Sequence, residues 1–556
     1  MESRPLSAWK QVLAGLVLVA ALLAVVVVRR GSGSVRPRVA LHQRSGHRVA
    51  SMFMDDDHLI YSATPTVTRT LDTLKSLGVT EIRATVVWKL IAPDSASAVM
   101  PQGFSGSDPA AYSAARWAPY DRLVELAGAR GITIDFNPTA PGPLWAVRPR
   151  APSARYADHW VPSSAAFGRF VQALGTRYSG HYVPPGAHGP LPGVHFWSIW
   201  NEPNQPGWLA PQWRASPTGP VMQAPVLYRG YVDAGFAALD RTGHRPGSDT
   251  ILVGELAPEG CVAGTHCIYP RPEWPIPPIP FLEGLYCVDS GFHPLSGAAA
   301  SQLGCPRSPD PSRFASAHPA LFQATGLAHH PYSFFLAPNA PMANPAFAPL
   351  ANLVRLEHTL DSIFRSYGVS RRLPLYLTEY GYETNPPNPY RGVPPEVQSR
   401  YLNQAQYLAW RDPRVVTMNQ FLLYDARPNR HYPPGSPGYW STFQTGLLYA
   451  NGARKPSFDS YRLPIFLPDP ELKVGHHVHV WAMIRVAPSG APQQAEIQWR
   501  PGSKSSYRTL AHARTEAASE VIQTTVTVPG PGAIRVRWAS PTGQVQYSRA
   551  ATVRAR

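Results

Sequence analysis

The sequence predicts an α/β protein with a (β/α)8 barrel followed by a small all-β sandwich, and three observations lead to this prediction. Between residues 49 and 463, short β-rich runs alternate with amphipathic helical segments. From about residue 464 the pattern changes to short alternating runs separated by Gly and Pro. A run of 17 residues without a charge, VLAGLVLVAALLAVVVV (12–28), lies near the N-terminus. We therefore expect one large domain, one small domain and a terminal extension.

The apolar N-terminal run is at the lower limit for spanning a bilayer and is long for a signal-peptide core. No small-x-small cleavage site lies beside Arg29 and Arg30, so we expect an uncleaved membrane anchor over residues 1–30. Residues 31–48 are basic and rich in Gly and Ser, which is typical of a linker. The arginines that follow the run outnumber the basic residues before it, and the positive-inside rule would then keep the rest of the chain in the cytoplasm.

Four cysteines favour the opposite orientation. Cys261, Cys267, Cys287 and Cys305 fall within one stretch rich in Pro and Gly. An even number of cysteines in such a loop predicts two disulfides and therefore an oxidising compartment. The sequence alone does not determine which cysteines pair. A zinc site is the alternative, but the stretch has no C-x2-C pair. We expect a single-pass membrane protein with an extracellular catalytic domain, or a secreted one if the N-terminal segment is cleaved.

The formal net charge of +16 comes mostly from arginines that are scattered along the chain. A nucleic-acid-binding protein would show basic blocks or an aromatic-basic motif, and neither occurs. We expect no nucleic-acid partner, no metal, no cofactor and a monomer. The 62 prolines and 43 glycines predict long ordered loops between the regular elements.

Eight β-rich runs define the large domain, and each is followed by a helical pattern or a long loop. The runs are 49–54, 81–88, 132–137, 194–201, 250–256, 325–330, 374–379 and 415–424. The helical patterns are 67–77, 117–130, 163–179, 225–242, 311–323, 349–367 and 396–411. Eight βα repeats over residues 49–463 predict a closed parallel barrel. An open, doubly wound sheet is the alternative, but no Gly-rich phosphate-binding sequence follows any run. The alternating runs over residues 464–556 predict the sandwich.

Acidic residues stand at several predicted strand ends, where barrel enzymes carry their catalytic groups. They are Asp135, Glu202, Glu255, Glu379 and Asp425. Glu202 ends the fourth strand and Glu379 the seventh, so their side chains can converge across the barrel mouth. Such a pair is the minimum needed to hydrolyse a glycosidic bond. Aromatic residues at or beyond strand ends offer faces on which sugars stack, although each alone is also explained by packing. They are Trp88, Trp145, Trp200, Trp208, Tyr332, Tyr382, Tyr424 and Trp440.

Two motifs resemble the catalytic signatures of the retaining (β/α)8 glycoside hydrolases, the clan that includes cellulase-like and β-xylosidase-like families. They are WNEP at 200–203 and TEYG at 378–381. Three further segments are similar to family segments in the same chain order, namely RATVVWKLIAP (83–93), AHHPY (328–332) and GLLYANGARKP (446–456). The likeness covers roughly residues 50–463. Residues 464–556 resemble appended immunoglobulin-like modules only loosely.

The resemblance implies a role for each matching residue. Glu202 would be the general acid/base, and Glu379 the nucleophile that forms a glycosyl-enzyme. Asn201 would bind the sugar 2-hydroxyl, and Arg83 would lower the pKa of Glu379. The other residues expected to bind or orient substrate are His330, Tyr332, Trp88, Trp145, Trp208 and Tyr424. One departure is the eighth strand end, where many relatives carry a tryptophan and this chain has Tyr424 and Asp425.

The sequence therefore favours a retaining hydrolase of a β-linked oligosaccharide or polysaccharide. A transglycosylase using the same site is a close variant. A non-catalytic glycan-binding protein and a structural envelope protein are the alternatives from other classes. The presence of both glutamates argues against the first of these, and the aromatic-lined mouth argues against the second.

Overall fold

The computed structural model describes residues 48–147, 151–261, 271–471, 476–487, 491–516 and 520–555. The chain divides into two compact units. One contains Val49–Ala426 and Gln444–Arg462, and the other contains Arg427–Phe443 and the chain from Leu463 onward. The membrane anchor expected over residues 1–30 lies outside the described residues, as does the linker expected over 31–48 apart from Arg48. Among the described residues, no helix combines the length and the apolar character needed to cross a bilayer.

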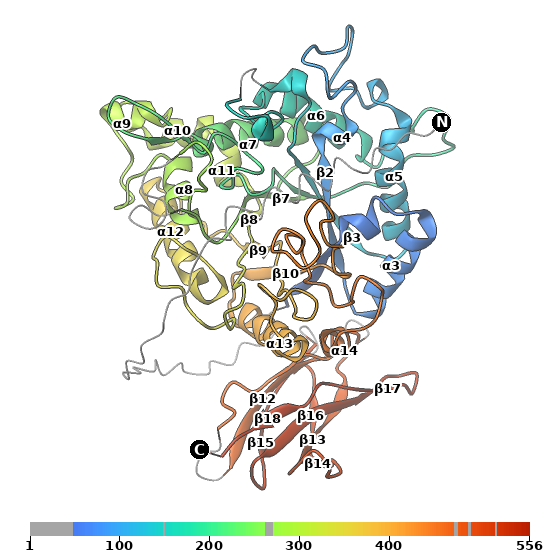
Figure 1. The fold of residues 1–556 in the computed structure, drawn as a ribbon. Helices are drawn as coiled ribbons and strands as arrows, with labels where there is room; N and C mark the ends of the chain where they lie inside the picture. The colour runs from blue at the N-terminus through green and yellow to red at the C-terminus, as the bar shows by residue number, and fades with distance from the viewer. Residues whose placement is uncertain are drawn as a thin grey trace. The chain divides into compact units, whose positions relative to one another are not determined.

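The larger unit contains a closed barrel of eight parallel strands, in the order β1-β10-β9-β8-β7-β4-β3-β2 (Figure 1). The strands are β1 (Ala50–Met54), β2 (Glu81–Val87), β3 (Thr133–Thr139), β4 (Phe196–Ser198), β7 (Thr250–Leu256), β8 (Gly326–His329), β9 (Leu375–Leu377) and β10 (Val415–Phe421). Each lies within or overlaps one of the eight predicted runs. The predicted closed barrel is confirmed, and the open doubly wound sheet is wrong.

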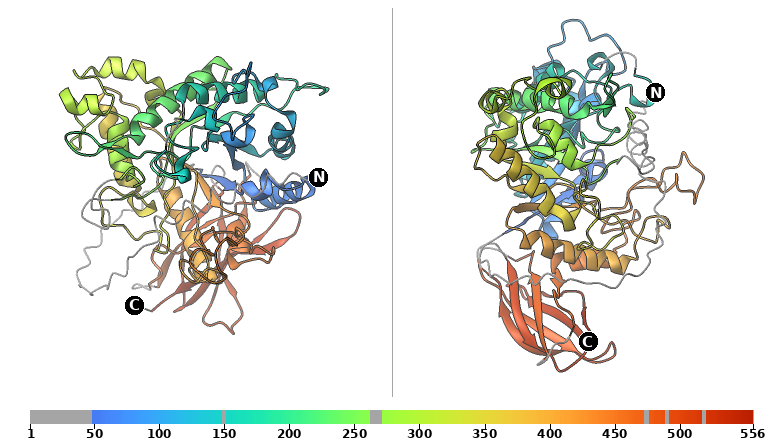
Figure 2. Two further views of the ribbon diagram at one scale, coloured as in Figure 1. Left: turned by 45° about the horizontal axis from the view of Figure 1, so that its top comes forward. Right: turned by 90° about the vertical axis from the view of Figure 1, so that its left-hand side faces the viewer.

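Helices surround the barrel (Figures 1 and 2). The long ones are α3 (Thr64–Ser76), α5 (Ala114–Gly128), α6 (Ser164–Arg177), α7 (Ala224–Arg241), α12 (Leu353–Ser366) and α13 (Pro395–Arg411). The shorter ones are α2 (Asp56–Leu59), α4 (Trp88–Ile91), α8 (Pro278–Leu285), α9 (Gly297–Gln302), α10 (Pro311–Ala317), α11 (Pro319–Gln323) and α14 (Pro456–Arg462). The helix expected over 311–323 is interrupted at His318, because Pro319 cannot donate the backbone hydrogen bond that continues a helix.

Each long helix buries one face. In α12, the apolar residues Leu353, Leu356, Leu360 and Ile363 recur at three- and four-residue spacing and are buried. This period places them on one side of the helix, which packs inward while polar residues face out. Four 3-10 turns, η1 (Pro109–Ala111), η2 (Leu144–Ala146), η3 (Ala154–Tyr156) and η4 (Leu350–Asn352), and a short hairpin of β5 (Trp213–Arg214) and β6 (Val221–Met222) complete this unit.

The barrel interior changes from apolar to polar along the strands. Met52, Phe196, Leu252 and Ala328, from β1, β4, β7 and β8, form a buried apolar cluster. Met54, Ser198 and His330 follow Met52, Phe196 and Ala328 by two residues each. Side chains two apart in a strand point the same way, so these residues lie in the next layer toward the carboxyl ends. That layer is the polar one in which Glu202 and Glu379 lie.

The second unit holds two antiparallel sheets. One contains β11 (Ile465–Phe466), β12 (His477–Met483) and β15 (Val521–Thr527). The other contains β13 (Gln494–Arg500), β14 (Arg508–Arg514), β16 (Gly532–Ala539), β17 (Val545–Tyr547) and β18 (Ala551–Val553). Residues from both sheets, including Trp499, Trp538 and Val480, share one apolar core. An all-β domain after the barrel is thus confirmed, and an immunoglobulin-like topology stays a prediction.

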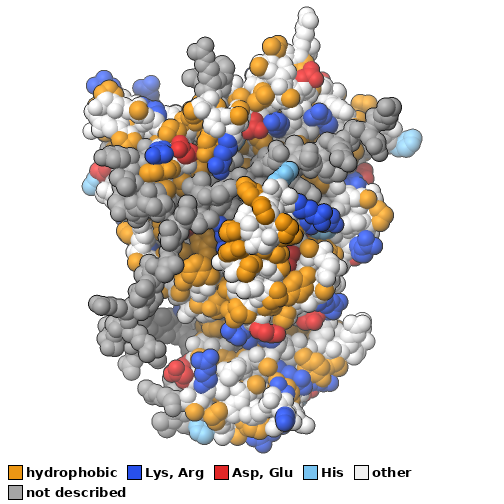
Figure 3. All heavy atoms as spheres, viewed as in Figure 1, with side chains coloured by type: hydrophobic (Ala, Val, Ile, Leu, Met, Phe, Trp, Pro, Cys, Tyr) orange, Lys and Arg blue, Asp and Glu red, His pale blue; other side chains and the backbone are white. Residues whose placement is uncertain are grey.

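Basic side chains are dispersed on the face drawn in Figure 3. The Lys and Arg groups of the described residues, shown in blue, stand apart over many elements rather than in one field. This distribution agrees with the scattered arginines of the sequence.

A disulfide joins Cys287 to Cys305, with Cα atoms 5.9 Å apart and a sequence separation of 18. Cys261 is also disulfide-bonded. Cys267 lies outside the described residues. The expectation of disulfides in this stretch is thus confirmed for Cys287 and Cys305.

Removing the Cys287–Cys305 bridge should destabilise the barrel unit. A cross-link that closes a loop of this size restricts the unfolded chain and contributes about 3 kcal/mol. We expect the double variant Cys287→Ala/Cys305→Ala to lose about that much free energy of unfolding. Urea unfolding of the variant and wild type, both without reductant, measures the difference. An unchanged transition midpoint would contradict the prediction.

Candidate active site

Unusual backbone conformations present the site residues at the ends of β4 and β7. Trp200, Glu202 and Glu255 have φ angles of 70°, 37° and 51°, in the left-handed region that non-glycine residues rarely adopt. Such conformations cost about 1–3 kcal/mol each and cluster at functional sites. The backbone N–H of Glu202 donates to the carbonyl of Glu255 at 2.9 Å, which ties the two strand ends together.

A bulge in β7 directs Glu255 into the barrel. The register with β8 shifts between Gly254 and Leu256. Gly254 has a φ of 109°, and a Cβ there would lie 2.6 Å from the Ala328 carbonyl oxygen. Only glycine fits this position. Because a bulge re-aims the side chain beside it, Glu255 points toward the polar layer.

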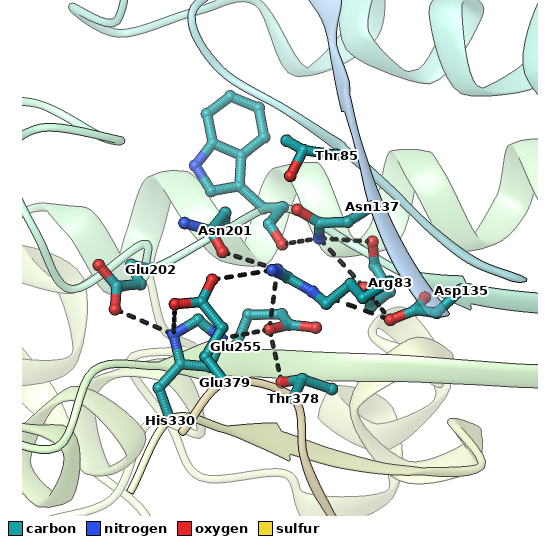
Figure 4. A network of polar contacts seen from close by, with 12 residues as sticks. Arg83, Thr85, Asp135, Asn137, Asn201, Glu202, Glu255, His330, Thr378 and Glu379 are labelled. Carbon is teal, nitrogen blue, oxygen red and sulfur yellow. Dashed lines mark hydrogen bonds and ion pairs between the residues drawn. The ribbon is translucent and has the colours of Figure 1, made fainter. Parts of the chain in front are cut away.

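Arg83, on β2, lies at the centre of a buried polar network (Figure 4). Its Nη1 donates to Glu379 Oε1 at 2.8 Å and to Met54 Sδ at 3.0 Å. Its Nη2 donates to Asn201 Oδ1 at 2.7 Å and to Glu255 Oε2 at 3.1 Å. The guanidinium therefore fixes residues from the ends of four other strands, β1, β4, β7 and β9.

Asp135 lies next to Arg83 in the register of β2 and β3, and its Oδ2 is 3.8 Å from Arg83 Nε. Ser198, on β4, donates to the same Asp135 oxygen at 3.1 Å. Asn137 donates from Nδ2 to the carbonyl and hydroxyl of Ser198 and to the carbonyl of Trp200. These contacts hold the start of the β4–α7 connection, which carries Glu202.

His330 links the two carboxylates that the sequence singles out. Its Nδ1 is 2.9 Å from Glu202 Oε1 and 3.7 Å from Glu379 Oε2. Carboxylate oxygens of Glu202 and Glu379 lie within 4.8 Å of one another. Tyr332 donates its hydroxyl to Glu379 Oε2 at 3.0 Å. His330 is fully buried, whereas the side chains of Glu202 and Glu379 keep 16% and 11% of their surface exposed, so solutes can reach both carboxylates.

Charge and burial set the ionisation of the network. Burial would raise the pKa of Glu255, but Arg83, His330 and Thr378 lower it to about 2. Burial would lower the pKa of His330, but Glu379 and the hydrogen bonds to Glu202 and Glu255 raise it to about 10. Near neutral pH, His330 is therefore a cation and Glu255 an anion.

Glu379 differs from the sequence expectation in one respect. Arg83 and His330 do favour its ionised form, but burial outweighs them and raises the pKa of Glu379 above its ordinary value. Burial and the Glu255 charge raise the pKa of Asp135 well above its usual range, which keeps Asp135 protonated. Arg83 and His330 both face the carboxyl groups of Glu255 and Glu379.

Of the aromatic residues expected to bind substrate, Trp88 and Trp208 are buried, whereas Trp145 and Tyr424 are partly exposed. Trp88 is fully buried, with its ring 5.8 Å from Phe170 and 5.9 Å from Phe167. Its ring has no free face for a sugar, so the structure places Trp88 in the core instead. Trp208 is nearly buried, at 8% exposure, and Trp145 is partly exposed, with Nε1 bound to the Pro93 carbonyl.

Tyr424 is partly exposed at the eighth strand end and stacks on His58 at a centroid distance of 4.2 Å. Asp55 holds both residues, since it accepts from the Tyr424 backbone N–H and contacts His58 Nδ1 at 2.8 Å. This pair lies at the eighth strand end, for which the family resemblance of the sequence led us to expect a tryptophan. Asp425 is instead part of a buried ion pair with Lys455, at 2.6 Å.

Three ligand atoms of Glu202, His330 and Glu379 lie close enough to hold a metal ion, and so do those of His195, His244 and Asp249. In the first group, His330 is itself a cation and Arg83 lies 2.8 Å from Glu379. Two positive charges at this distance disfavour a third, so the group suits proton transfer better than metal binding.

Sequence reasoning identified Arg83, Asn201, Glu202, His330, Tyr332 and Glu379, and the structure brings these six together. It placed Glu255 and Asp135 at strand ends without a role in the network. It missed Thr378, which donates to Glu255 Oε2 at 2.8 Å, and Ser198. Two features of the sequence could have indicated them: Thr378 directly precedes Glu379, and Ser198 ends the fourth strand.

No protein-family model and no curated protein sequence matches the chain. Solved structures with a similar fold include a GH39 β-xylosidase from Caulobacter crescentus, 13% identical, where the match covers 88% of this chain and 98% of that chain at a TM-score of 0.44. A GH5_18 protein from Streptomyces cattleya, crystallised with GlcNAc, is 14% identical over 74% of this chain and 79% of that chain, at a TM-score of 0.42. An exo-β-1,4-mannosidase from Opitutaceae bacterium strain TAV5 is 14% identical over 76% and 61%, at a TM-score of 0.40. At these identities and TM-scores, the matches assign no family or substrate to this chain.

Proposed function

We propose that this protein is a retaining glycoside hydrolase that cleaves a β-linked oligosaccharide or polysaccharide by double displacement. One observation carries the proposal: Glu202 and Glu379 follow β4 and β9, which are separated by two strands in the barrel, yet their carboxylate oxygens lie within 4.8 Å of one another. Retaining enzymes hold their two carboxyl groups about 5–5.5 Å apart, whereas inverting enzymes leave about 6.5–9.5 Å for a water molecule. The short spacing favours direct attack by one carboxylate on the sugar.

In the first step Glu202 protonates the glycosidic oxygen while Glu379 attacks the anomeric carbon, so the leaving group departs as an alcohol and a glycosyl ester forms. In the second step Glu202 takes a proton from water, the water oxygen bonds to the anomeric carbon, and Glu379 leaves as a carboxylate. Asn201 Oδ1 accepts from Arg83. This contact leaves the amide group of Asn201 to donate to the sugar 2-hydroxyl.

Arg83 and Tyr332 serve Glu379 in both steps. Each donates to a different carboxylate oxygen, at 2.8 Å and 3.0 Å. These bonds orient the carboxylate before attack and stabilise its charge when the ester breaks. Tyr424 and His58 would line the subsite, with their stacked rings in place of an indole.

We also propose that the catalytic unit works outside the cell, held by the apolar segment 12–28. The Cys287–Cys305 disulfide supports this location, because such bonds persist in oxidising compartments.

Trapping of the glycosyl-enzyme tests the proposed function. The soluble chain from about residue 45 is incubated with a panel of 2-deoxy-2-fluoro glycosides, which form slowly hydrolysed esters with a retaining nucleophile. Peptide mass spectrometry then locates the adduct. We expect one adduct, on Glu379, and the sugar that reacts identifies the substrate class.

An adduct on a different carboxylate would overturn the assigned roles. No adduct with any sugar, together with no turnover of mixed glycans, would favour the glycan-binding alternative. Products longer than the substrate would instead indicate transglycosylation by the same site.

A further inference from the structure

We infer that Glu255 is a positioning residue that acts through His330: it keeps the imidazole protonated and oriented between Glu202 and Glu379. The inference rests on the proposed function for its catalytic consequence, although the ionisation of His330 can be measured without it. Glu255 has no exposed surface and contacts His330 at Nε2, whereas Glu202 and Glu379 face Nδ1, so Glu255 does not touch the substrate.

The geometry assigns this role. His330 Nε2 lies 2.6 Å from Glu255 Oε2, and Nδ1 on the other side of the ring lies 2.9 Å from Glu202 Oε1. A neutral imidazole has one N–H and can donate to only one of these carboxylates. The imidazolium donates to both, and its remaining charge faces Glu379 Oε2 at 3.7 Å. Two opposed carboxylates thus select the cationic ring.

Glu255 is itself held rigidly. Its Oε2 also accepts from Arg83 Nη2 at 3.1 Å and from Thr378 Oγ1 at 2.8 Å. The bulge at Gly254 directs the side chain inward. A carboxylate with this many donors stays ionised, so it provides a fixed negative charge beside His330.

The other titratable groups near His330 do not replace Glu255. His330 faces Glu202 from the β4 end and Glu379 from the β9 end. Arg83 and Tyr332 act on His330 only through their hydrogen bonds to Glu379. Its chain neighbour His329 is neutral, because burial lowers the pKa of His329 to about 4. Glu202 and Glu379 change protonation or form an ester during the proposed reaction. Glu255 alone holds a constant charge on the ring.

The test compares Glu255→Gln with wild type. Gln keeps the size and one acceptor oxygen but removes the charge. We expect the pKa of His330 to fall, as followed by 15N NMR of the histidine ring nitrogens, with the His330 signals assigned from a His330→Gln variant. Wild-type His330 should stay doubly protonated at neutral pH, whereas the variant should titrate there.

Activity should show the same dependence on pH. Catalysis by the variant should approach wild type near about pH 5, where the ring is protonated in both, and then fall roughly tenfold for each pH unit above the lowered pKa. Glu255→Asp, which keeps the charge, should restore much of the activity at high pH. Glu283→Gln, a change of a partly buried glutamate on α8, serves as the matched control and should leave the profile unchanged.

Three outcomes would overturn the inference. They are a neutral His330 in wild type near neutral pH, an unaltered His330 titration in Glu255→Gln, and an activity loss in that variant that is equal at every pH. If Glu255→Gln does not fold, the wild-type and Glu255→Asp titrations still decide it. Failure of the proposed function gives a different result, namely no trapping of the wild-type protein by any fluoro-glycoside.

Discussion

Replacing Glu379 with Gln should abolish hydrolysis. An amide cannot form the glycosyl ester, so we expect kcat to fall on the order of 10⁵-fold, the scale of loss when a covalent nucleophile is removed. The side chain keeps its volume, its amide oxygen can still accept from Arg83, and its NH2 group can donate to the Tyr332 hydroxyl oxygen. The loss of kcat is measured by the hydrolysis of an aryl glycoside that carries the sugar found to trap the wild-type protein.

The thermal transition of Glu379→Gln should remain close to that of wild type, because the amide has the same shape and replaces a buried carboxylate whose pKa burial already raises. Glu283→Gln again serves as the control for the loss of a partly buried carboxylate. Activity within tenfold of wild type would show that another group is the nucleophile.

Replacing Glu202 with Ala should have an effect that depends on the leaving group. General acid-base catalysis contributes about 10²–10⁴-fold, so kcat/KM should fall by that range on glycosides whose leaving group needs a proton. On an activated aryl glycoside, the first step should be nearly normal and the second slow. A burst of phenol release followed by a slow steady state, seen in stopped-flow experiments, would report this imbalance.

Azide should restore the second step of Glu202→Ala. A small anion can enter the space left by the carboxylate and attack the ester without base assistance. We expect a faster steady state and a glycosyl azide with the anomeric configuration of the substrate. Equal losses on activated and unactivated glycosides, with no response to azide, would show that Glu202 has a structural role.

The barrel could be predicted because each of its strands carries a local signal. The run TILVGEL in β7 is mostly apolar on both faces, and EIRATVV in β2 has one buried apolar face of Ile82, Ala84 and Val86, as expected of strands covered by helices. In the second unit, β14 carries only a weak local signal, because its sequence, RTLAHAR, is largely exposed, lies at the edge of its sheet and has no alternating apolar face. The helical pattern over 311–323 did not show that the helix would be interrupted at His318.

The sequence predicted the site residues that lie at a strand end within a recognisable motif, such as Glu202 and Glu379. The role of Glu255 could not, because it depends on a bulge in β7 that the sequence indicates only by Gly254. The sequence also could not separate Trp88 from Tyr424. Both follow strand ends, and only the packing of Phe167 and Phe170 shows that Trp88 is enclosed.

The stereochemistry of the released sugar tests the account most directly. With the unfluorinated glycoside of the sugar that traps the wild-type protein, 1H NMR in D2O can follow the anomeric proton of the first product before mutarotation. Double displacement through Glu379 predicts that the product initially has the β configuration of the substrate. Initial release of the α anomer would show a single displacement by water, and would contradict both the role of Glu379 as nucleophile and the short carboxylate spacing on which the proposal depends.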